Sequence, residues 1–354
     1  MPSGFRRAGA ILGVSPHSAS KRNFRKAVTT ASAPSIIQEE EADRLIDLIV
    51  DQSKTWQMAS VVRMATSEKV VRFIDLTQGI VRPRECGTEH DTASITATAC
   101  TLNVVDLVVQ FPICDDVLDF NIEGPELEAH ILEMTAKVMA NELELLAWMG
   151  NTDGSYSTPL LYSGTIALFD GWYKQLQDGH VVNALDATDT SGRALHVCKF
   201  NDLMRALPTK WRTDKGSLRY FMPDDMHLDW QAIVAGRQTP MGDQALMGGA
   251  TDKFGNTPIV PVPLLPTDLS TCSGGSVSPA NGAFMVLTDP ANLVLGIQKN
   301  ITYEREREAR KARTWHIWNI RFDAQICVPD ATALYDCMDV GECEDLYCQP
   351  QTCA

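Results

Sequence analysis

The alternation of apolar and polar positions between 115 and 154 predicts one long helix. Gly124 and Pro125 suit its start, because a proline at the first helical position loses no hydrogen bond. Gly150, in the sequence GNTDG, suits its end. The helix 124–149 would be roughly 39 Å long at about 1.5 Å per residue, which favours an elongated subunit over a compact enzyme. The apolar stripe that we expect to face a core is Leu127, Ile131, Met134, Val138 and Leu145, with Met139 and Leu146 beside it.

Two stretches of strand-like composition flank a polar segment before this helix. Residues 56–73 are rich in valine, and residues 92–113 are rich in threonine and valine. The segment between them contains Gly79, Pro83 and Gly87. Two long arms around a polar middle predict an extended, projecting hairpin rather than an ordinary surface loop.

The clearest single strand covers 315–328, where apolar and polar residues alternate. One face is expected to carry Trp318, Ile320, Phe322, Ala324, Ile326 and Val328, and the other Asn319, Arg321, Asp323 and Gln325. Further elements are predicted as a short helix near Ser35, a helix over 201–211, a strand over 217–223, a helix from Met226, a proline-rich edge strand over 257–266 and a buried strand over 282–288.

Composition narrows the classes of function. The 354 residues, 44% of them hydrophobic, allow one large domain or two ordinary ones. A net charge of -14 argues against general nucleic-acid binding by the body of the protein, although residues 1–28 carry six basic residues and no acid. This basic stretch is interpreted either as a solvated tail or as an arm that binds a neighbour or nucleic acid.

No apolar run is long enough to span a bilayer, and the start of the chain lacks the pattern of a signal peptide. We therefore expect synthesis in a reducing cytoplasm, where the ten cysteines begin as free thiols.

No constellation of residues points to catalysis, a cofactor or a metal. The seven histidines have no metal-ligand spacing, and no serine lies in a glycine-flanked nucleophile elbow. The adjacent acids Asp115–Asp116 and Asp224–Asp225 diverge from each other, so we interpret them as turn and cap residues. A cluster of four cysteines near the end leaves three alternatives open, namely zinc, disulfides formed after release, or free thiols: Cys337, Cys343, Cys348 and Cys353.

The order of these features resembles the major capsid proteins of tailed bacteriophages, which have the Hong Kong 97-type fold. The local matches are FPICDDVLDF before the long helix, RQTPMGDQALMGG followed by FGNTPIVPVPLLP, and TDPANLVLGIQKNITYE before the last strand. Together with the basic arm, the hairpin and the long helix, they cover most of the chain from Ala59 to Val328.

The resemblance implies an α+β fold with an N-terminal arm, an extended loop, a peripheral domain with a long spine helix, and an axial domain. It implies assembly as hexamers and pentamers into an icosahedral shell around double-stranded DNA. The expected divisions are 1–55 for the arm, 56–114 for the extended loop and peripheral-domain strands, 115–157 for the spine helix, 158–289 for the axial domain, 290–330 for further peripheral-domain strands, and 331–354 for a C-terminal segment with a cysteine-rich tail.

The expected partners follow from the same resemblance. They are other copies of the chain, a scaffolding protein, the portal, a decoration protein, and packaged DNA contacted without sequence specificity, with no membrane and no cofactor. The location would be the virion capsid, assembled in the host cytoplasm. Mixed charge at the hairpin tip suggests docking on the alternating charges that follow position 303 in a neighbour. The proposed contact residues are Arg82, Arg84, Glu85, Glu89 and Asp91 at the tip, and Glu304, Arg305, Glu306 and Arg307 on the partner stretch.

The chain departs from the family in two respects. We expect it to lack the long N-terminal scaffold domain that some members cleave off, so a separate scaffolding protein or the short arm would guide assembly. Lys69 is the only lysine between Trp56 and Asp115, and it lies in a strand arm, so we do not infer a lysine cross-link. Two other functions remain as alternatives: an encapsulin-like shell that encloses an enzyme, and a cytoplasmic enzyme with an unfamiliar site.

Overall fold

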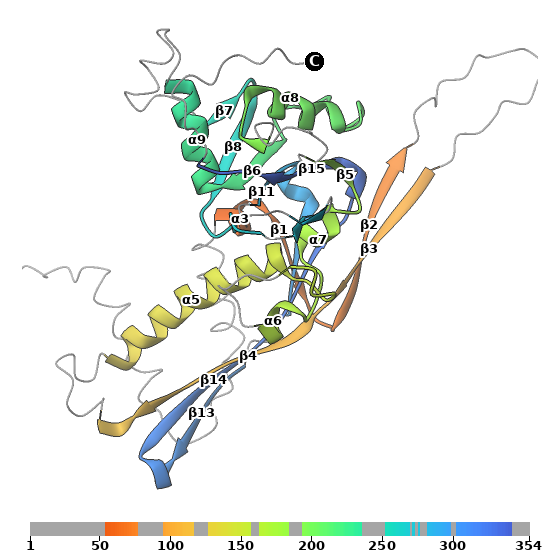
Figure 1. The fold of residues 1–354 in the computed structure, drawn as a ribbon. Coiled ribbons are helices and arrows are strands. Elements are labelled where there is room, and N and C mark those ends of the chain that lie inside the picture. The colour runs from red at the N-terminus through yellow and green to blue at the C-terminus, as the bar shows by residue number, and fades with distance from the viewer. Residues whose placement is uncertain are drawn as a thin grey trace, which may run out of the picture.

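The computed structural model describes residues 54–76, 95–116, 127–156, 163–183, 193–235, 252–269, 271–272, 275–276, 282–298 and 302–341 (Figure 1). Their helices are α3 (Lys54–Met58), α5 (Leu127–Met149), α6 (Ser163–Ile166), α7 (Trp172–Leu176), α8 (Val197–Ala206) and α9 (Asp224–Ala235). Their strands are β1 (Ser60–Met64), β2 (Glu68–Leu76), β3 (Ile95–Asn103), β4 (Val105–Cys114), β5 (His180–Asn183), β6 (Arg219–Pro223), β7 (Lys253–Phe254), β8 (Thr257–Val262), β9 (Thr271–Cys272), β10 (Gly275–Ser276), β11 (Ala283–Thr288), β12 (Leu293–Gln298), β13 (Thr302–Glu308), β14 (Arg313–Ile326) and β15 (Thr332–Met338).

The first large sheet is built around β14. Along one edge of β14, strand β13 pairs with its first half and β12 pairs with its last residues. Strand β4 pairs with the opposite edge, and all three strands are antiparallel to β14. Strand β1 pairs in parallel with β12 on its outer side. Because β14 is longer than its neighbours, its first half extends with β4 and β13 as a three-stranded arm away from the body (Figure 1).

The second large sheet has the order β5-β15-β11-β6-β8-β7. Helices α8 and α9 cover one face, where Phe200 packs against Tyr220 of β6 and Trp230 packs against Phe200. The other face packs on α7 and the C-terminal half of α5, where Trp148 contacts Trp172 and Phe284. All six residues of β11 are buried, as expected for the centre of a sheet covered on both faces.

One apolar core joins the two sheets through the end of α5. It contains Trp148 and Phe284 next to the second sheet, and Trp56 and Phe322 next to the first, with the rings of Trp56 and Phe322 stacked at 5.4 Å. The N-terminal half of α5 extends beyond this core (Figure 1).

Of the two predicted arms, 56–73 and 92–113, only the outer parts form the hairpin: β2 and β3 make a separate two-stranded sheet that stands off the body (Figure 1). The inner parts belong to the first sheet, where β1 pairs with β12 and β4 pairs with β14. Strands β2 and β3 pair without interruption from Glu68 opposite Asn103 to Leu76 opposite Ile95. Its tip, 77–94, lies outside the described residues, as do the short helix predicted near Ser35 and the expected helix start at Gly124.

Several predictions of local structure were wrong at particular positions. Trp56 belongs to the short helix α3 rather than to a strand, because its ring fills the core against Phe322. Helix α8 begins at Val197 instead of Asn201, since the side chain of His196 accepts a hydrogen bond from the amide of Cys198 and caps the helix earlier.

The apolar stripe on α5 was partly misassigned. Met134 and Val138 are 55% and 54% exposed, whereas Met139 and Ala140 are buried, as are Leu145 and Leu146. The helix turns by about 100° per residue, so the exposed pair lies on the side opposite Ala136 and Ala140. The buried side of α5 carries the small residues Ala136 and Ala140, which allow neighbouring elements to approach the helix closely.

The alternation of β14 was confirmed for the apolar face, where Trp318, Ile320 and Phe322 are buried. It failed at Asp323, which is 1% exposed although it belongs to the polar set. The junction of β3 and β4 covers this carboxylate, and the amide of Asn103 donates a hydrogen bond of 2.7 Å to its Oδ2. No helix in the described part of the chain is long and apolar enough to cross a membrane.

Candidate assembly surfaces

The described residues offer little for catalysis. They contain no group of three or more histidine, cysteine or acidic side chains that could hold a metal ion. Buried histidines have structural partners instead: His316 Nδ1 lies 2.6 Å from the hydroxyl of Tyr303, and His227 Nε2 lies 3.3 Å from a carboxylate oxygen of Asp252.

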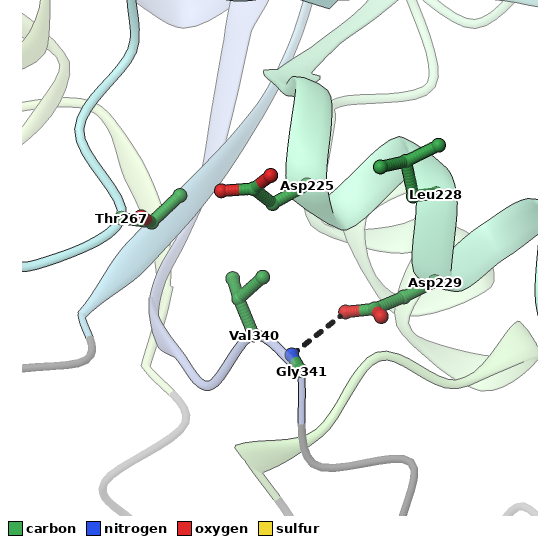
Figure 2. Close-up of a pocket in the computed structure, with 6 residues that line it drawn as sticks. All are labelled: Asp225, Leu228, Asp229, Thr267, Val340 and Gly341. Carbon is green, nitrogen blue, oxygen red and sulfur yellow. Dashed lines mark hydrogen bonds between the residues drawn. The ribbon is translucent and has the colours of Figure 1, made fainter.

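A pocket of about 340 Å³ lies between α9 and the chain that leaves β15 (Figure 2). Asp225 and Asp229 line it from α9, with Leu228 beside them. The amide of Gly341 donates a hydrogen bond of 3.1 Å to Asp229, and burial raises the pKa of that carboxyl. This bond holds Gly341 against α9, so the carboxylate of Asp229 in this pocket has a structural partner.

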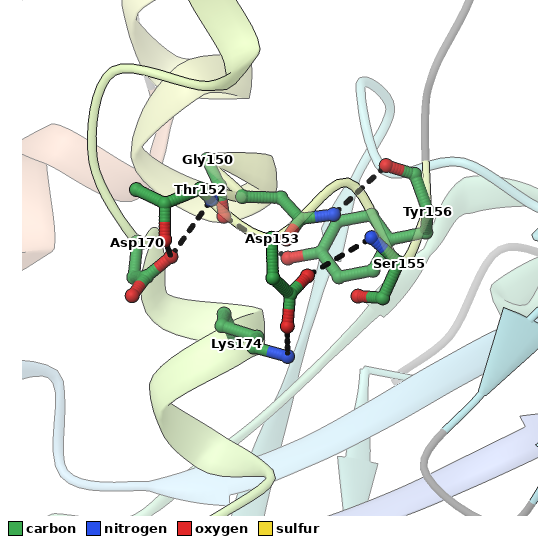
Figure 3. A network of polar contacts seen from close by, with 8 residues as sticks. Gly150, Thr152, Asp153, Ser155, Tyr156, Asp170 and Lys174 are labelled. Atoms are coloured by element: carbon green, nitrogen blue, oxygen red, sulfur yellow. Dashed lines mark hydrogen bonds and ion pairs between the residues drawn. The ribbon is translucent and has the colours of Figure 1, made fainter.

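The turn that ends α5 is held by a polar network (Figure 3). Thr152 donates to the carboxylate of Asp170 through both its amide and its hydroxyl. Lys174 of α7 lies 2.5 Å from Asp153, and this contact holds the pKa of Asp153 at about 2. The hydroxyl of Tyr156 donates to the carbonyl of Gly150 at 3.0 Å. The predicted GNTDG turn therefore fixes α5 to α6 and α7 at the junction of the two sheets.

The base of the hairpin rests on a small apolar core of its own. Met64, Leu102 and Val294 are buried there. A Cβ on Gly296 of β12 would lie 2.9 Å from the sulfur of Met64, so a larger residue there would require the Met64 side chain to shift. Cys100 of β3 forms a disulfide with Cys327, which follows β14. No local pattern predicted this pair, because the two cysteines are 227 residues apart.

The charged stretch after position 303 forms the edge strand β13 of the arm. The four proposed contact residues in it are exposed, although Arg307 also pairs with Asp115 at 2.5 Å within the subunit. Glu308 pairs with Lys311 and Arg313, and these partners lower its pKa to about 2. The stretch was expected to be solvated or to form an interface. Its last residues instead make ion pairs within the subunit.

The two faces of this arm differ in chemistry. Tyr303, His316, Trp318 and Phe111 stack on the face that continues the core. The opposite face carries Val108 of β4, which is 56% exposed, next to its β14 partner Asn319. Among the described strands, none pairs with the outer edges of β13 or β4. The arm therefore presents edges and a face that other chains can contact.

The remaining predicted residues are only partly described. The tip residues Arg82, Arg84, Glu85, Glu89 and Asp91 lie outside the described residues, as do Cys343, Cys348 and Cys353. Cys337 does not lie in an exposed tail: it is fully buried in β15, and it is disulfide-bonded, as is Cys198. Strand β15 itself was not predicted, and it adds the segment after 331 to the second sheet.

Comparison with known proteins relates this fold to phage capsids. No family model matches the chain. Over 309 residues it is 26% identical to the putative prophage capsid protein YqbE of Bacillus subtilis (strain 168), an alignment that covers 86% of this chain and 94% of that protein. A chain of the satellite phage P4 procapsid superposes with a TM-score of 0.62 at 15% identity, covering 93% of this chain and 99% of that one. The capsid chain of an empty GTA particle superposes with a TM-score of 0.51 at 16% identity, covering 81% and 90%.

The same architecture also occurs in a compartment shell. A chain of the SrpI encapsulin complex from Synechococcus elongatus PCC 7942 superposes with a TM-score of 0.51 at 9% identity, covering 97% of this chain and 100% of that one. At this identity the likeness concerns the fold alone, and the P4 procapsid chain superposes better. The resemblance to the major capsid proteins of tailed bacteriophages is therefore confirmed, and the chain has their fold.

Proposed function

We propose that the chain is a major capsid protein that assembles as hexamers and pentamers into an icosahedral shell around double-stranded DNA. The observation that carries this proposal is the capsid fold across nearly the whole chain, with 93% covered by the P4 procapsid subunit. A fold by itself does not set a function, but the sequence similarity to a prophage capsid protein points the same way.

The shape of the subunit supports assembly. The hairpin of β2 and β3 and the arm of β4, β13 and β14 both leave the body, and the N-terminal half of α5 extends beyond the main core (Figure 1). A two-stranded hairpin is marginal alone in water, so a partner surface would stabilise it. Met134 and Val138 on α5 and Val108 on β4 are large apolar side chains exposed on these extensions. Exposed apolar side chains on projecting elements suit contacts with other copies of the chain.

The hairpin tip and strand β13 are the contact that we propose between neighbouring subunits. The five charged tip residues named above would dock on Glu304, Arg305, Glu306 and Arg307 of the next copy. The exposure of these four side chains on an edge strand supports the proposal. Each exposed ion pair contributes only about 0–1 kcal/mol, but a shell repeats the contact in every subunit.

Further partners are proposed from the same role. A scaffolding protein, a portal and a decoration protein would act with the shell, and the virion, assembled in the host cytoplasm, would be the location. A net charge of -14 suits a shell that contacts packaged DNA but binds it weakly, because acidic side chains repel the phosphates. A catalytic role has no support among the described residues, which contain neither a metal-ligand cluster nor a reactive constellation.

Assembly of the full chain tests this function. The protein is expressed alone and together with the products of neighbouring genes, and it is examined by light scattering and negative-stain microscopy. Pentamers, hexamers or closed shells are expected. A monodisperse monomer under every condition, including with the scaffolding protein, would overturn the proposal. Nuclease-resistant DNA inside particles separates a virion shell from a compartment shell, which would enclose a protein cargo.

A further inference from the structure

The hairpin joins the body through two short connections that lie side by side. Residues 65–67 link β1 to β2, and Val104 alone links β3 to β4. The amide of Val104 donates a hydrogen bond of 3.1 Å to the carbonyl of Ser67, so the two connections touch. Among the described strands, β2 and β3 pair only with each other. In the described part of the chain, the backbone links between the hairpin and the body are therefore confined to this pair of connections.

The disulfide lies beyond these connections and joins the hairpin to the first sheet. Cys100 belongs to β3, where it is paired with Val71 of β2. Cys327 directly follows β14, the central strand of the sheet. Their Cα atoms are 5.0 Å apart, and the bond spans 227 residues of chain. It adds a covalent attachment to the two connections, to the buried core at the hairpin base and to the hydrogen bond from Asn103 to Asp323, and it fixes the tilt of the hairpin against the sheet.

The surroundings of the bond protect it in the closed position. Cys100 and Cys327 are 7% and 3% exposed, and they pack with Met64, Leu102 and Val294. An apolar environment disfavours a thiolate, and a buried sulfur is out of reach of dissolved thiols. The bond therefore forms or breaks only while the base of the hairpin is transiently open.

We propose that Cys100 and Cys327 are a redox modification site that locks the tilt of the hairpin. As thiols they leave the hairpin free to adjust, and as a disulfide they fix it. The co-reactant is a low-molecular-weight disulfide such as oxidised glutathione. That the lock forms during or after shell assembly rests on the proposed function. Such a subunit would be made in a reducing cytoplasm, and released particles would meet an oxidising environment.

The chemistry is a pair of thiol–disulfide exchanges. The thiolate of one cysteine attacks the small disulfide, forms a mixed disulfide and expels one small thiolate. The thiolate of the second cysteine then attacks the protein sulfur of that mixed disulfide, forms the Cys100–Cys327 bond and expels the other small thiolate. Two protein thiols are oxidised, one small disulfide is reduced to two small thiols, and the two protein thiol protons balance the two thiolates released.

The test compares the full-length subunit after reduction with dithiothreitol and after oxidation with oxidised glutathione. Peptide mapping with alkylation should find a peptide linking Cys100 to Cys327 in the oxidised sample only. Hydrogen exchange at 68–76 and 95–103 should be several-fold slower in the oxidised subunit, because fixing the tilt suppresses local opening. Equal exchange in both states, or full alkylation of both cysteines after oxidation, would overturn the proposal.

Matched variants separate this bond from the other cysteines. The double variant Cys100→Ala with Cys327→Ala should exchange at 68–76 and 95–103 like the reduced subunit in both conditions. Cys114 is an exposed free thiol, so Cys114→Ser should respond to redox as the wild type does. If the double variant is insoluble, hydrogen exchange at 68–76 and 95–103 is compared before and after reduction in the wild type and in Cys114→Ser. Slower exchange in the oxidised form of both proteins supports the lock, and unchanged exchange in both overturns it. Every readout uses the unassembled subunit, so the two proposals can fail separately. Redox-dependent hydrogen exchange in a protein that never forms shells would refute the proposed function and support the disulfide lock. Shell formation with redox-independent exchange would support the proposed function and refute the lock.

Discussion

The amide of Gly171 donates a hydrogen bond of 2.9 Å to the carbonyl of Gly150, and the two backbones meet with no side chain between them. A Cβ on Gly150 would lie 2.5 Å from the carbonyl oxygen of Phe169. A Cβ on Gly171 would lie 2.6 Å from the amide nitrogen of Gly150. Both obstacles are backbone atoms, which cannot swing aside. The two glycines therefore set how closely the end of α5 approaches α7.

Alanine at either glycine should destabilise the subunit. Gly150→Ala and Gly171→Ala force the two backbones apart, and we expect each to cost about 1–3 kcal/mol or more in the free energy of unfolding measured with urea. Gly216→Ala is the matched control, because a Cβ there meets only side-chain atoms of Asp214 and Asn256. A cost for Gly150→Ala no larger than that of the control would contradict the close contact.

The two sides of α5 should respond differently to substitution. Replacing the exposed Met134 and Val138 by serine should change the free energy of unfolding by no more than about 0.5 kcal/mol each, because no core is disturbed. Met139→Ala should cost about 2–5 kcal/mol, since that side chain is buried in the main core. Urea unfolding of the three variants provides the measurement. In the proposed shell, the serine variants should weaken assembly. Equal destabilisation by Met134→Ser and Met139→Ala would mean that the exposed side also packs within the subunit.

His316 should make stability depend on pH below neutrality. Burial and, secondly, the charge of Arg305 lower the pKa of His316 from 6.5 to about 4. The unfolded chain binds this proton below about pH 6.5, whereas the folded chain binds it only near pH 4. The stability that the neutral ring contributes is therefore complete above pH 6.5 and is lost as the pH falls towards 4, at up to about 1.4 kcal/mol per pH unit.

Urea unfolding of wild type and His316→Gln between pH 4 and 8 measures this contribution. The difference between the two proteins should be constant above pH 6.5 and shrink below it. Tyr303, Phe111 and Trp318 surround the ring and do not change their charge in this range. Burial raises the pKa of Asp323 and Asp229, an effect of opposite sign that is shared by both proteins and cancels. A constant difference down to pH 4 would show that the ring is not buried in its neutral form.

Shortening the hairpin tip should separate folding from assembly. Replacing Gly79–Asp91 with a short glycine–serine turn leaves β2 and β3 and their base intact, so the circular dichroism spectrum and solubility should not change. Closed shells should fail to form or should fall apart at high salt, where ion pairs are screened. Reversing the charges of Arg82 and Arg84 should act more mildly, and compensating reversals at Glu304 and Glu306 should restore part of the assembly. If the deletion variant is unfolded, the tip belongs to the core of its own subunit. If the variant forms normal shells, the tip is not needed for assembly.

The last cysteines of the chain should be tested apart from Cys337, which is buried in β15 and unsuited to joining subunits. If Cys343, Cys348 and Cys353 link neighbours, particles alkylated before denaturation should give a ladder on non-reducing gels. Reductant should collapse that ladder to one band. A single monomer band without reductant would exclude covalent links between subunits.

The sequence by itself determined the elements whose patterns are long and local. The hairpin, the end of the long helix at Gly150 and the apolar face of β14 all follow from periodicity and turn residues, because these reflect constraints within one segment. The order of these elements was also enough to indicate the capsid fold, which the comparisons confirmed.

Tertiary structure alone decided which side of each element is buried and which distant residues meet. Met134 fits the apolar period of α5, yet the core lies on the side of Ala136 and Ala140, because small residues admit the closest neighbours. Asp323 fits the polar period of β14, yet the junction of β3 and β4 covers it and supplies its hydrogen bond. Cys100 and Cys327 meet across 227 residues of sequence. Burial and long-range pairing depend on the packing of whole elements against one another, and no local pattern along the chain encodes that packing.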